Sequence, residues 1–207
     1  MAITYPLSTP TSIGYAEVTL SALDAVAVSE SPFSYKQQVF QHTGQRWSAS
    51  LSIPPVGRQL AEPWVAFLLA LNGRAGTFLL GDPLCTTPQG EGGGTVTVNG
   101  AGQTGSSLSV TGATVSQTDW LKAGDYIQLG SGSSSRLHKV LQDVDTDASG
   151  NATLDIWPDL RSSPADGASV TLTDCKGVFR LASNGRSWNI NNTNSYGISF
   201  EAVEALA

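Results

Sequence analysis

The clearest pattern in the chain is a strict alternation of apolar and polar residues between Trp47 and Ile53. A period of two places successive side chains on opposite faces of a β-strand. The apolar face carries Trp47, Ala49, Leu51 and Ile53. The other face is small and polar, with Ser48, Ser50 and Ser52. The stretch is therefore predicted to be a strand of a sheet with one buried face.

Neighbouring segments extend this strand into a sheet. Residues 35–41 precede it across a turn centred on Thr43-Gly44, so the pattern predicts a hairpin over residues 35–53. Two earlier strands are expected at residues 15–20 and 25–29.

One helix is predicted between residues 58 and 73. Its apolar residues recur at helical spacing and share one face, and they are Leu60, Trp64, Phe67, Leu68 and Leu71. Proline is tolerated in the first turn of a helix, so Pro63 predicts a start near Ala61 or Glu62. Asn72-Gly73 is a typical stop signal. We expect the apolar face to cover the hairpin sheet, and a short strand to follow at residues 77–80.

The character of the sequence changes near residue 88. A glycine-rich run, PQGEGGG, is followed by short strand-like stretches separated by turn residues. These stretches are residues 95–98, 107–110, 125–129, 136–141, 152–157 and 168–173. Short strands without a helical period are typical of a small barrel or sandwich. Longer strand-like runs return after Cys175.

The predicted fold class is mainly β. A β-rich domain with one α-helix, residues 1–88 and 176–207, is interrupted by an inserted small β-barrel or β-sandwich domain, residues 89–175. An inserted domain leaves and rejoins its host at nearby points, so Cys85 and Cys175 are expected to be neighbours. A disulfide between them is the minor alternative, because the expected compartment is reducing.

Charge and hydropathy exclude several classes of partner. The net charge is −6, and the 11 Lys and Arg are scattered, so no basic stripe is present to hold nucleic acid. The longest apolar run, residues 64–71, is too short to insert into a membrane. The first residues have neither the charged nor the apolar region of a signal peptide, so we expect synthesis in the cytosol.

The run DVDTDASGN is the strongest candidate for a metal site. Asp143, Asp145 and Asp147 match the first three ligand positions of an EF-hand loop, but Ala148 replaces its glycine and Leu154 its final glutamate. Strands rather than helices are expected on both sides. We predict a hairpin loop with solvated acidic side chains, and a weak cation site is the alternative.

Catalytic chemistry has little support. His42 and His138 fall in different predicted domains, and neither lies near a serine in a nucleophile motif. The cysteines and histidines lack the spacing of zinc ligands. Two carboxylates suffice for a glycosidase, but no pair stands out among the 17 Asp and Glu. We predict no catalytic residue, no cofactor and no metal, so the protein is not expected to be an enzyme.

Three aromatic residues of the insertion, Trp120, Tyr126 and Trp157, raise the alternative of a carbohydrate-binding surface. Exposed aromatic rings on a small β-barrel can stack on sugar rings. Core packing is the competing interpretation for all three residues.

Long stretches of the chain resemble a tail protein of bacteriophages with long flexible tails. They are YPLSTPTSIGYAEVTL, AVAVSESPFSYKQQVFQHTGQRWSASLSIPPV and AEPWVAFLLALNGRAGTFLLGDP. The insertion run LKAGDYIQLG, then LHKVLQDVDTDASGNATLDIWPDLRSSPADGASV and KGVFRLAS, belongs to the same pattern. Together these stretches cover most of the chain. The architecture is similar to that of the distal tail protein family of siphophages.

The resemblance implies a belt domain, β-rich with one helix, six copies of which form a ring at the tip of the tail tube. A second β domain, galectin-like or a small barrel of oligonucleotide/oligosaccharide-binding type, decorates the outside of that ring. In the family this second domain is often C-terminal, whereas here it is internal.

The function implied by the resemblance is that of a structural virion protein, made in the bacterial cytoplasm and located at the tail tip. Its expected partners are itself in a hexameric ring, the tail tube protein, the tail-tip or baseplate hub and the tape measure protein. The face of Ser48, Ser50 and Ser52 is the candidate interface. The alternatives are a carbohydrate-binding tail or baseplate component that contacts host glycan, and a tail-associated hydrolase.

Overall fold

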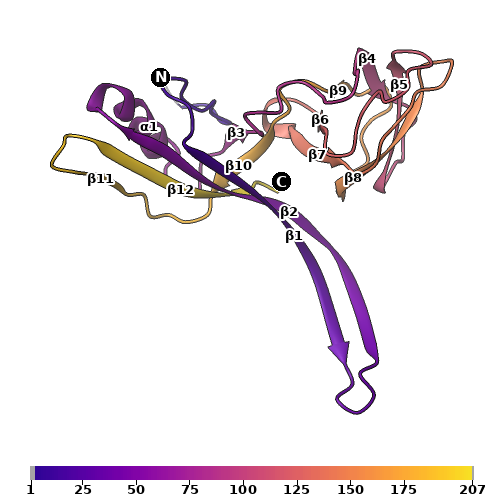
Figure 1. The fold of residues 1–207 in the computed structure, drawn as a ribbon, viewed down its shortest axis with the longest axis horizontal. Helices are drawn as coiled ribbons and strands as arrows, with labels where there is room; N and C mark the ends of the chain where they lie inside the picture. Colours follow the sequence, from indigo (N-terminus) through magenta and orange to yellow (C-terminus); the bar gives the residue numbers. More distant parts are fainter. Residues whose placement is uncertain (1–2, 207) are drawn as a thin grey trace.

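The protein is mainly β, with two sheets and one α-helix, in a computed structural model that describes residues 3–206 (Figure 1). The first sheet consists of β1 (Glu17–Glu30), β2 (Gln37–Val56), β3 (Phe78–Leu80), β10 (Gly177–Leu181), β11 (Trp188–Ile190) and β12 (Tyr196–Glu204). Its strands are antiparallel in the order β1-β2-β12-β10-β3, and β11 pairs with β12. The predicted fold class is confirmed.

The second sheet curls into a nearly closed barrel. Its strands are β4 (Gly94–Val98), β5 (Gly105–Ala113), β6 (Tyr126–Leu129), β7 (Arg136–Val140), β8 (Ala152–Leu160) and β9 (Val170–Thr171). Their order is β4-β5-β8-β7-β6-β9, and the two end strands approach each other where the Val98 N–H donates to the Ala168 carbonyl at 2.8 Å. A short 3-10 helix, Gly132–Ser134, precedes β7. Each of the six stretches predicted between residues 95 and 173 overlaps one of these strands.

The helix α1 (Arg58–Ala70) begins earlier than Pro63 predicts. Proline cannot donate to the Gln59 carbonyl. Gln59 and Pro63 are both exposed, so water can solvate that carbonyl. Packing of the buried side chains Trp64 and Phe67 then outweighs the missing bond.

The apolar side of α1 covers one face of the first sheet. Trp64 lies 5.4 Å from Tyr15 and 6.3 Å from Phe200 between ring centroids, and Phe67 lies 5.5 Å from Phe78. Trp47, Ala49, Leu51 and Ile53 of β2 belong to the same buried cluster, as their alternation predicts. The inclusion of Leu60 in the apolar face is wrong, because its side chain is 44% exposed.

The predicted turn at Thr43-Gly44 is also wrong. These residues lie inside β2, and the chain reverses at residues 31–36 instead, where the Ser31 N–H donates to the Lys36 carbonyl at 3.0 Å. The two strands expected at residues 15–20 and 25–29 are one strand, β1. The register of the β1–β2 ladder shifts between Asp24 and Val26, opposite Gly44. Glycine within a strand often marks such a bulge, and this is the signal that resembled a turn.

The segments that enter and leave the barrel lie side by side. The Asp174 N–H donates to the Thr86 carbonyl at 2.8 Å, as expected for a domain inserted at one point of its host. Cys85 and Cys175, at the two ends of the insertion, are free thiols in this structure. Burial raises the pKa of Cys175 to about 12, which keeps this thiol protonated.

Trp47 joins the first sheet to the barrel. Its indole N–H donates to the Leu137 carbonyl of β7 at 2.9 Å, and its ring meets Trp157 of β8 edge to face at 4.6 Å between centroids. Tyr126 of β6 lies 6.1 Å from the same ring. The side chains of Tyr126 and Leu137 therefore belong to the core of the first sheet rather than to the interior of the barrel.

A buried ion pair completes this junction. Arg161, just after β8, binds both carboxylate oxygens of Glu204 in β12 at 2.8 Å. The same carboxylate accepts the backbone N–H of Trp47 at 3.1 Å, and only 2% of the Glu204 side chain is exposed. Removing one partner of such a pair leaves a buried group uncompensated.

We predict that Arg161→Met lowers the free energy of unfolding by about 3 kcal/mol, because it strips Glu204 of its charged partner while keeping most of the side-chain stem. Arg58→Met is the matched control. It breaks an ion pair with Glu62 whose side chains are 79% and 44% exposed, and it should change stability by about 0.5 kcal/mol or less. Urea unfolding measures both variants. Equal effects would contradict a structural role for the Arg161–Glu204 pair.

Candidate functional site

The three aromatic residues that raised the carbohydrate-binding alternative do not form an exposed surface, and the competing interpretation of core packing holds for Trp120 and Tyr126. Trp120 is fully buried in the barrel core, with its indole N–H donating to the Gly93 carbonyl at 3.2 Å. Tyr126 is buried, and its ring lies under Lys139 with the ammonium 4.2 Å from the ring centroid. Trp157 is half-buried against Trp47. Burial removes Trp120 and Tyr126 from any sugar-stacking role in this structure.

The aspartates of the 143–147 run support the loop between β7 and β8. Asp143 accepts the Ala123 N–H, and Asp145 accepts the Asp119 N–H, each at 2.8 Å. Asp147 accepts the N–H groups of Ser149 and Asn151 at 2.8 Å. Hydrogen bonds from Asn151 hold the pKa of Asp147 below its ordinary value of 3.8. All three aspartates are exposed in this loop, as predicted, and each one also binds backbone amides.

The metal and catalytic candidates stay dispersed. Within residues 3–206, no three side chains of His, Cys, Asp or Glu are grouped so that they could hold a metal ion. His42 is exposed on β2, whereas His138 is buried beneath the barrel wall and donates from Nδ1 to the Pro158 carbonyl at 2.6 Å. Burial lowers the pKa of His138 from 6.5 to about 4.

The serine face of β2 points away from the helix. Ser50 is exposed, and Ser48 and Ser52 are half-buried between their neighbouring strands. Ser52 pairs with Glu17 of β1, and Ser50 pairs with Glu201 of β12. The face is small and polar as predicted, but two carboxylates border it, so its expected lack of charge applies only to β2 itself.

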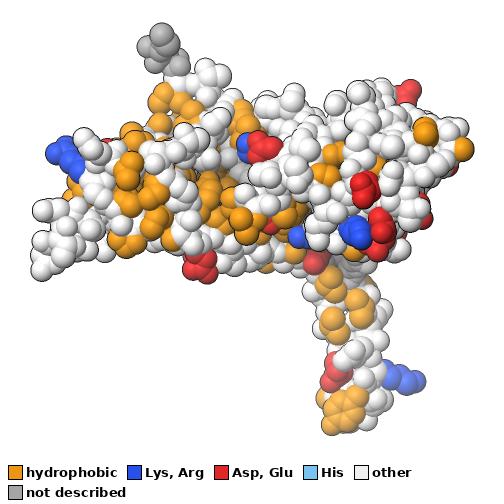
Figure 2. All heavy atoms as spheres, turned by 45° about the horizontal axis from the view of Figure 1, so that its top comes forward, with side chains coloured by type: hydrophobic (Ala, Val, Ile, Leu, Met, Phe, Trp, Pro, Cys, Tyr) orange, Lys and Arg blue, Asp and Glu red, His pale blue; other side chains and the backbone are white. Residues whose placement is uncertain are grey.

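The most exposed element was not anticipated from the sequence. Beyond the bulge, the ends of β1 and β2 form a two-stranded arm, residues 26–41, that projects from the body (Figure 1). Val26, Val28 and Val39 lie on one of its faces and Phe40 on the other, and each is about half exposed. Figure 2 shows hydrophobic side chains along this arm and at its end. The alternation of Val26 and Val28 in the sequence could have indicated a strand here. The same alternation is also typical of a strand with a buried face, so it does not predict an exposed arm.

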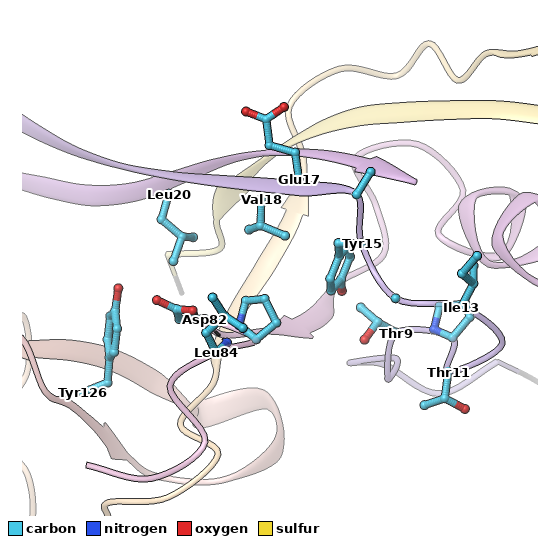
Figure 3. Close-up of a pocket in the computed structure, with 14 residues that line it drawn as sticks. Thr9, Thr11, Ile13, Tyr15, Glu17, Val18, Leu20, Asp82, Leu84 and Tyr126 are labelled. Atoms are coloured by element: carbon cyan, nitrogen blue, oxygen red, sulfur yellow. Dashed lines mark hydrogen bonds between the residues drawn. The ribbon is translucent and has the colours of Figure 1, made fainter. Parts of the chain in front are cut away.

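A groove of about 820 Å³ runs along the first half of β1. Residues 9–20 form one wall, and Asp82, Pro83 and Leu84 face it from the opposite side (Figure 3). Val18 and Leu20 point toward this second wall, and Tyr126 closes one end. The groove is the largest of the cavities described for residues 3–206.

The groove is mainly apolar and acidic. Its apolar lining includes Ile13, Tyr15 and Leu84, and Leu84 is 91% exposed. Asp82 points into it, while Glu17 lies at the rim with its carboxylate directed away from the floor. Asp82 accepts the Leu84 N–H at 3.0 Å and the Cys85 thiol at 3.4 Å, both neutral donors. No lysine or arginine belongs to the lining.

No helix within residues 3–206 has both the length and the apolar character needed to cross a membrane.

We predict that Asp147→Ala lowers the melting temperature at neutral pH, because three hydrogen bonds to its carboxylate are lost. The folded-state pKa is depressed, so the stabilisation is complete above pH 3.8 and disappears as pH falls through the depressed value. The difference from wild type should therefore shrink in acid. Glu91→Ala, the control, removes the same charge from an exposed side chain.

Calcium should leave these melting temperatures unchanged. A calcium-dependent rise in wild type that Asp147→Ala abolishes would instead establish a cation site.

We predict that His138 makes stability fall as pH decreases from 6.5 to about 4. The unfolded chain binds a proton in this window while the buried imidazole does not, so the unfolded state gains about 1.4 kcal/mol per pH unit. Chemical unfolding across this range should be less pH-dependent in His138→Gln. His42→Gln, at the exposed histidine, is the control and should retain the wild-type slope.

Comparison with known proteins assigns no family. No protein-family model matches the chain, and no curated protein matches its sequence.

Proposed function

We propose that this protein is a structural component of a long flexible phage tail, where it forms the distal ring that joins the tail tube to the tail-tip hub. The observation that best supports a role in assembly is the exposed arm. An isolated two-stranded hairpin is only marginally stable in water, and this one carries exposed apolar side chains on both faces. Exposed apolar surface of this kind marks an interaction site.

An open sheet edge supports the same proposal. β1 lies at one end of the first sheet, and no described strand pairs with its outer edge. At the opposite end, β3 is covered by the N-terminal segment, where the Leu7 N–H donates to the Thr77 carbonyl at 2.8 Å. An unpaired edge is a template for a strand of another chain. Contacts between two different surfaces of the same chain close into a ring when the rotation permits.

The arrangement of the two sheets is also consistent with a ring adaptor. The first sheet and its helix correspond to the belt that the sequence resemblance implies, and the barrel is inserted beside the arm rather than on it (Figure 1). Glu17 and Glu201 border the serine face and give this surface negative charge. A ring around a DNA-conducting tube benefits from such repulsion of phosphate.

No observation favours either alternative function. Trp120 and Tyr126 are buried, so carbohydrate recognition would rest on the half-buried Trp157. A hydrolase requires a positioned acid and base in a cleft. The groove contains Asp82, whose carboxylate binds its own loop.

We predict that the purified protein forms closed rings of about six subunits, because the arm and the β1 edge both need partners. Light scattering gives the mass, and negative-stain images distinguish rings from open chains. Ser50→Glu places a third carboxylate beside Glu17 and Glu201 and should weaken docking of the ring onto tail tubes in a co-sedimentation assay. Ser106→Glu, on the exposed surface of the barrel, is the matched control.

A strict monomer at high concentration that also fails to bind tail tubes would contradict the proposal. Binding to a glycan array that disappears in Trp157→Ala, in a variant that still folds, would favour the carbohydrate-binding alternative.

A further inference from the structure

The end of the arm exposes two aromatic side chains and a lysine. In the loop of residues 31–36, which we call the tip, Phe33 is 95% exposed and Tyr35 is 75% exposed. Lys36 follows directly and takes part in none of the ion pairs of the described chain. Two exposed aromatic rings beside a free cation are the composition of an interface anchor.

The groove along β1 has the complementary chemistry. Its volume of about 820 Å³ lies within the range of sites that enclose a sizeable ligand. The apolar side chains of Val18, Leu20 and Leu84 can receive aromatic rings. Asp82 points into the groove and takes part in none of the ion pairs of the described chain.

We propose that the tip of one copy of this chain inserts into the groove of a second copy, with Phe33 and Tyr35 against the apolar lining and Lys36 beside Asp82. This inference rests on the proposed function, since it identifies the contact that joins ring subunits. It commits to a second copy because the same chain presents both an exposed aromatic and cationic tip and an apolar and acidic groove of complementary chemistry.

A chain cannot fill its own groove. The arm points away from the segment of residues 9–20 and from β3 (Figure 1). The five residue pairs beyond the bulge alone extend the arm by about 17 Å. The contact is therefore heterologous, with the tip of each subunit donated to the next one.

The two strands of the arm behind the tip, residues 26–30 and 37–41, form its shaft. We expect this shaft to contribute to the same interface. Two aromatic side chains bury about 300 to 500 Å², which is less than the roughly 800 Å² per partner in a standard interface. Val26, Val28, Val39 and Phe40 provide further apolar surface behind the tip. The tip then acts as the anchor, and the shaft completes the buried area along the neighbour.

Two variants separate the two halves of the contact. The tip variant, Phe33→Asp/Lys36→Glu, removes an aromatic ring and reverses the charge. The groove variant, Leu84→Lys, places a cation on the apolar wall. All three side chains are exposed, so the fold should be retained, as circular dichroism can verify. Val115→Asp and Leu141→Lys, at exposed apolar positions of the barrel, are the matched controls.

Each variant alone should lose at least about thirtyfold in self-association, the loss typical of a buried anchor residue. Mixed in equal amounts, they should form a dimer and nothing larger, because one intact tip meets one intact groove and neither end can extend. Sedimentation velocity measures both results. The two control variants should assemble as wild type does.

Three outcomes would overturn the inference. They are wild-type assembly by both variants, a mixture that yields no dimer, and a groove variant that assembles while the tip variant does not. If wild type and both variants all form rings, the proposed function stands and only this contact is wrong. If the mixture gives the dimer while wild type forms open chains, the contact stands and the ring adaptor proposal fails.

Discussion

The position of Trp47 is the constraint on which the rest of the structure depends. Its side chain lies on the apolar face of β2, yet it contacts three strands of the barrel through Leu137, Trp157 and Tyr126. Its backbone N–H also binds Glu204, which Arg161 holds from the barrel side. One residue thus joins a sheet, a barrel and the C-terminal strand. The inserted barrel is consequently built into the core of its host instead of hanging from a linker.

Beyond this junction, no other described strand or helix covers the outer half of the β1–β2 hairpin. The helix packs against Tyr15, Phe78 and Phe200, all within the body of the molecule. Past the bulge at Asp24, the ladder continues without a third strand or a helix. Apolar side chains there are exposed whichever face they occupy. The arm and the groove are thus two incomplete surfaces of one chain, and assembly is the simplest way to complete both.

The sequence predicted local structure well and long-range placement poorly. The alternation from Trp47 to Ile53, the helix around Trp64 and the short barrel strands were all identified, because periodicity and turn residues are local signals. Gly44 was misread, since glycine marks bulges as well as turns. Trp120, Tyr126 and the groove could not be placed, because burial depends on which distant strands meet. The protruding arm was missed for the same reason: a strand pattern does not reveal what lies above the strand.

The hydrogen bond between Trp157 and Asp24 has a mechanical consequence. Trp157 belongs to β8 of the barrel, and its indole N–H donates at 2.9 Å to the Asp24 carboxylate, at the base of the arm. Gln45, next to the bulge, also accepts the Asp159 N–H at 2.7 Å. A force that pulls the barrel away from the first sheet therefore acts directly on the base of the arm, because both of these hydrogen bonds lie there.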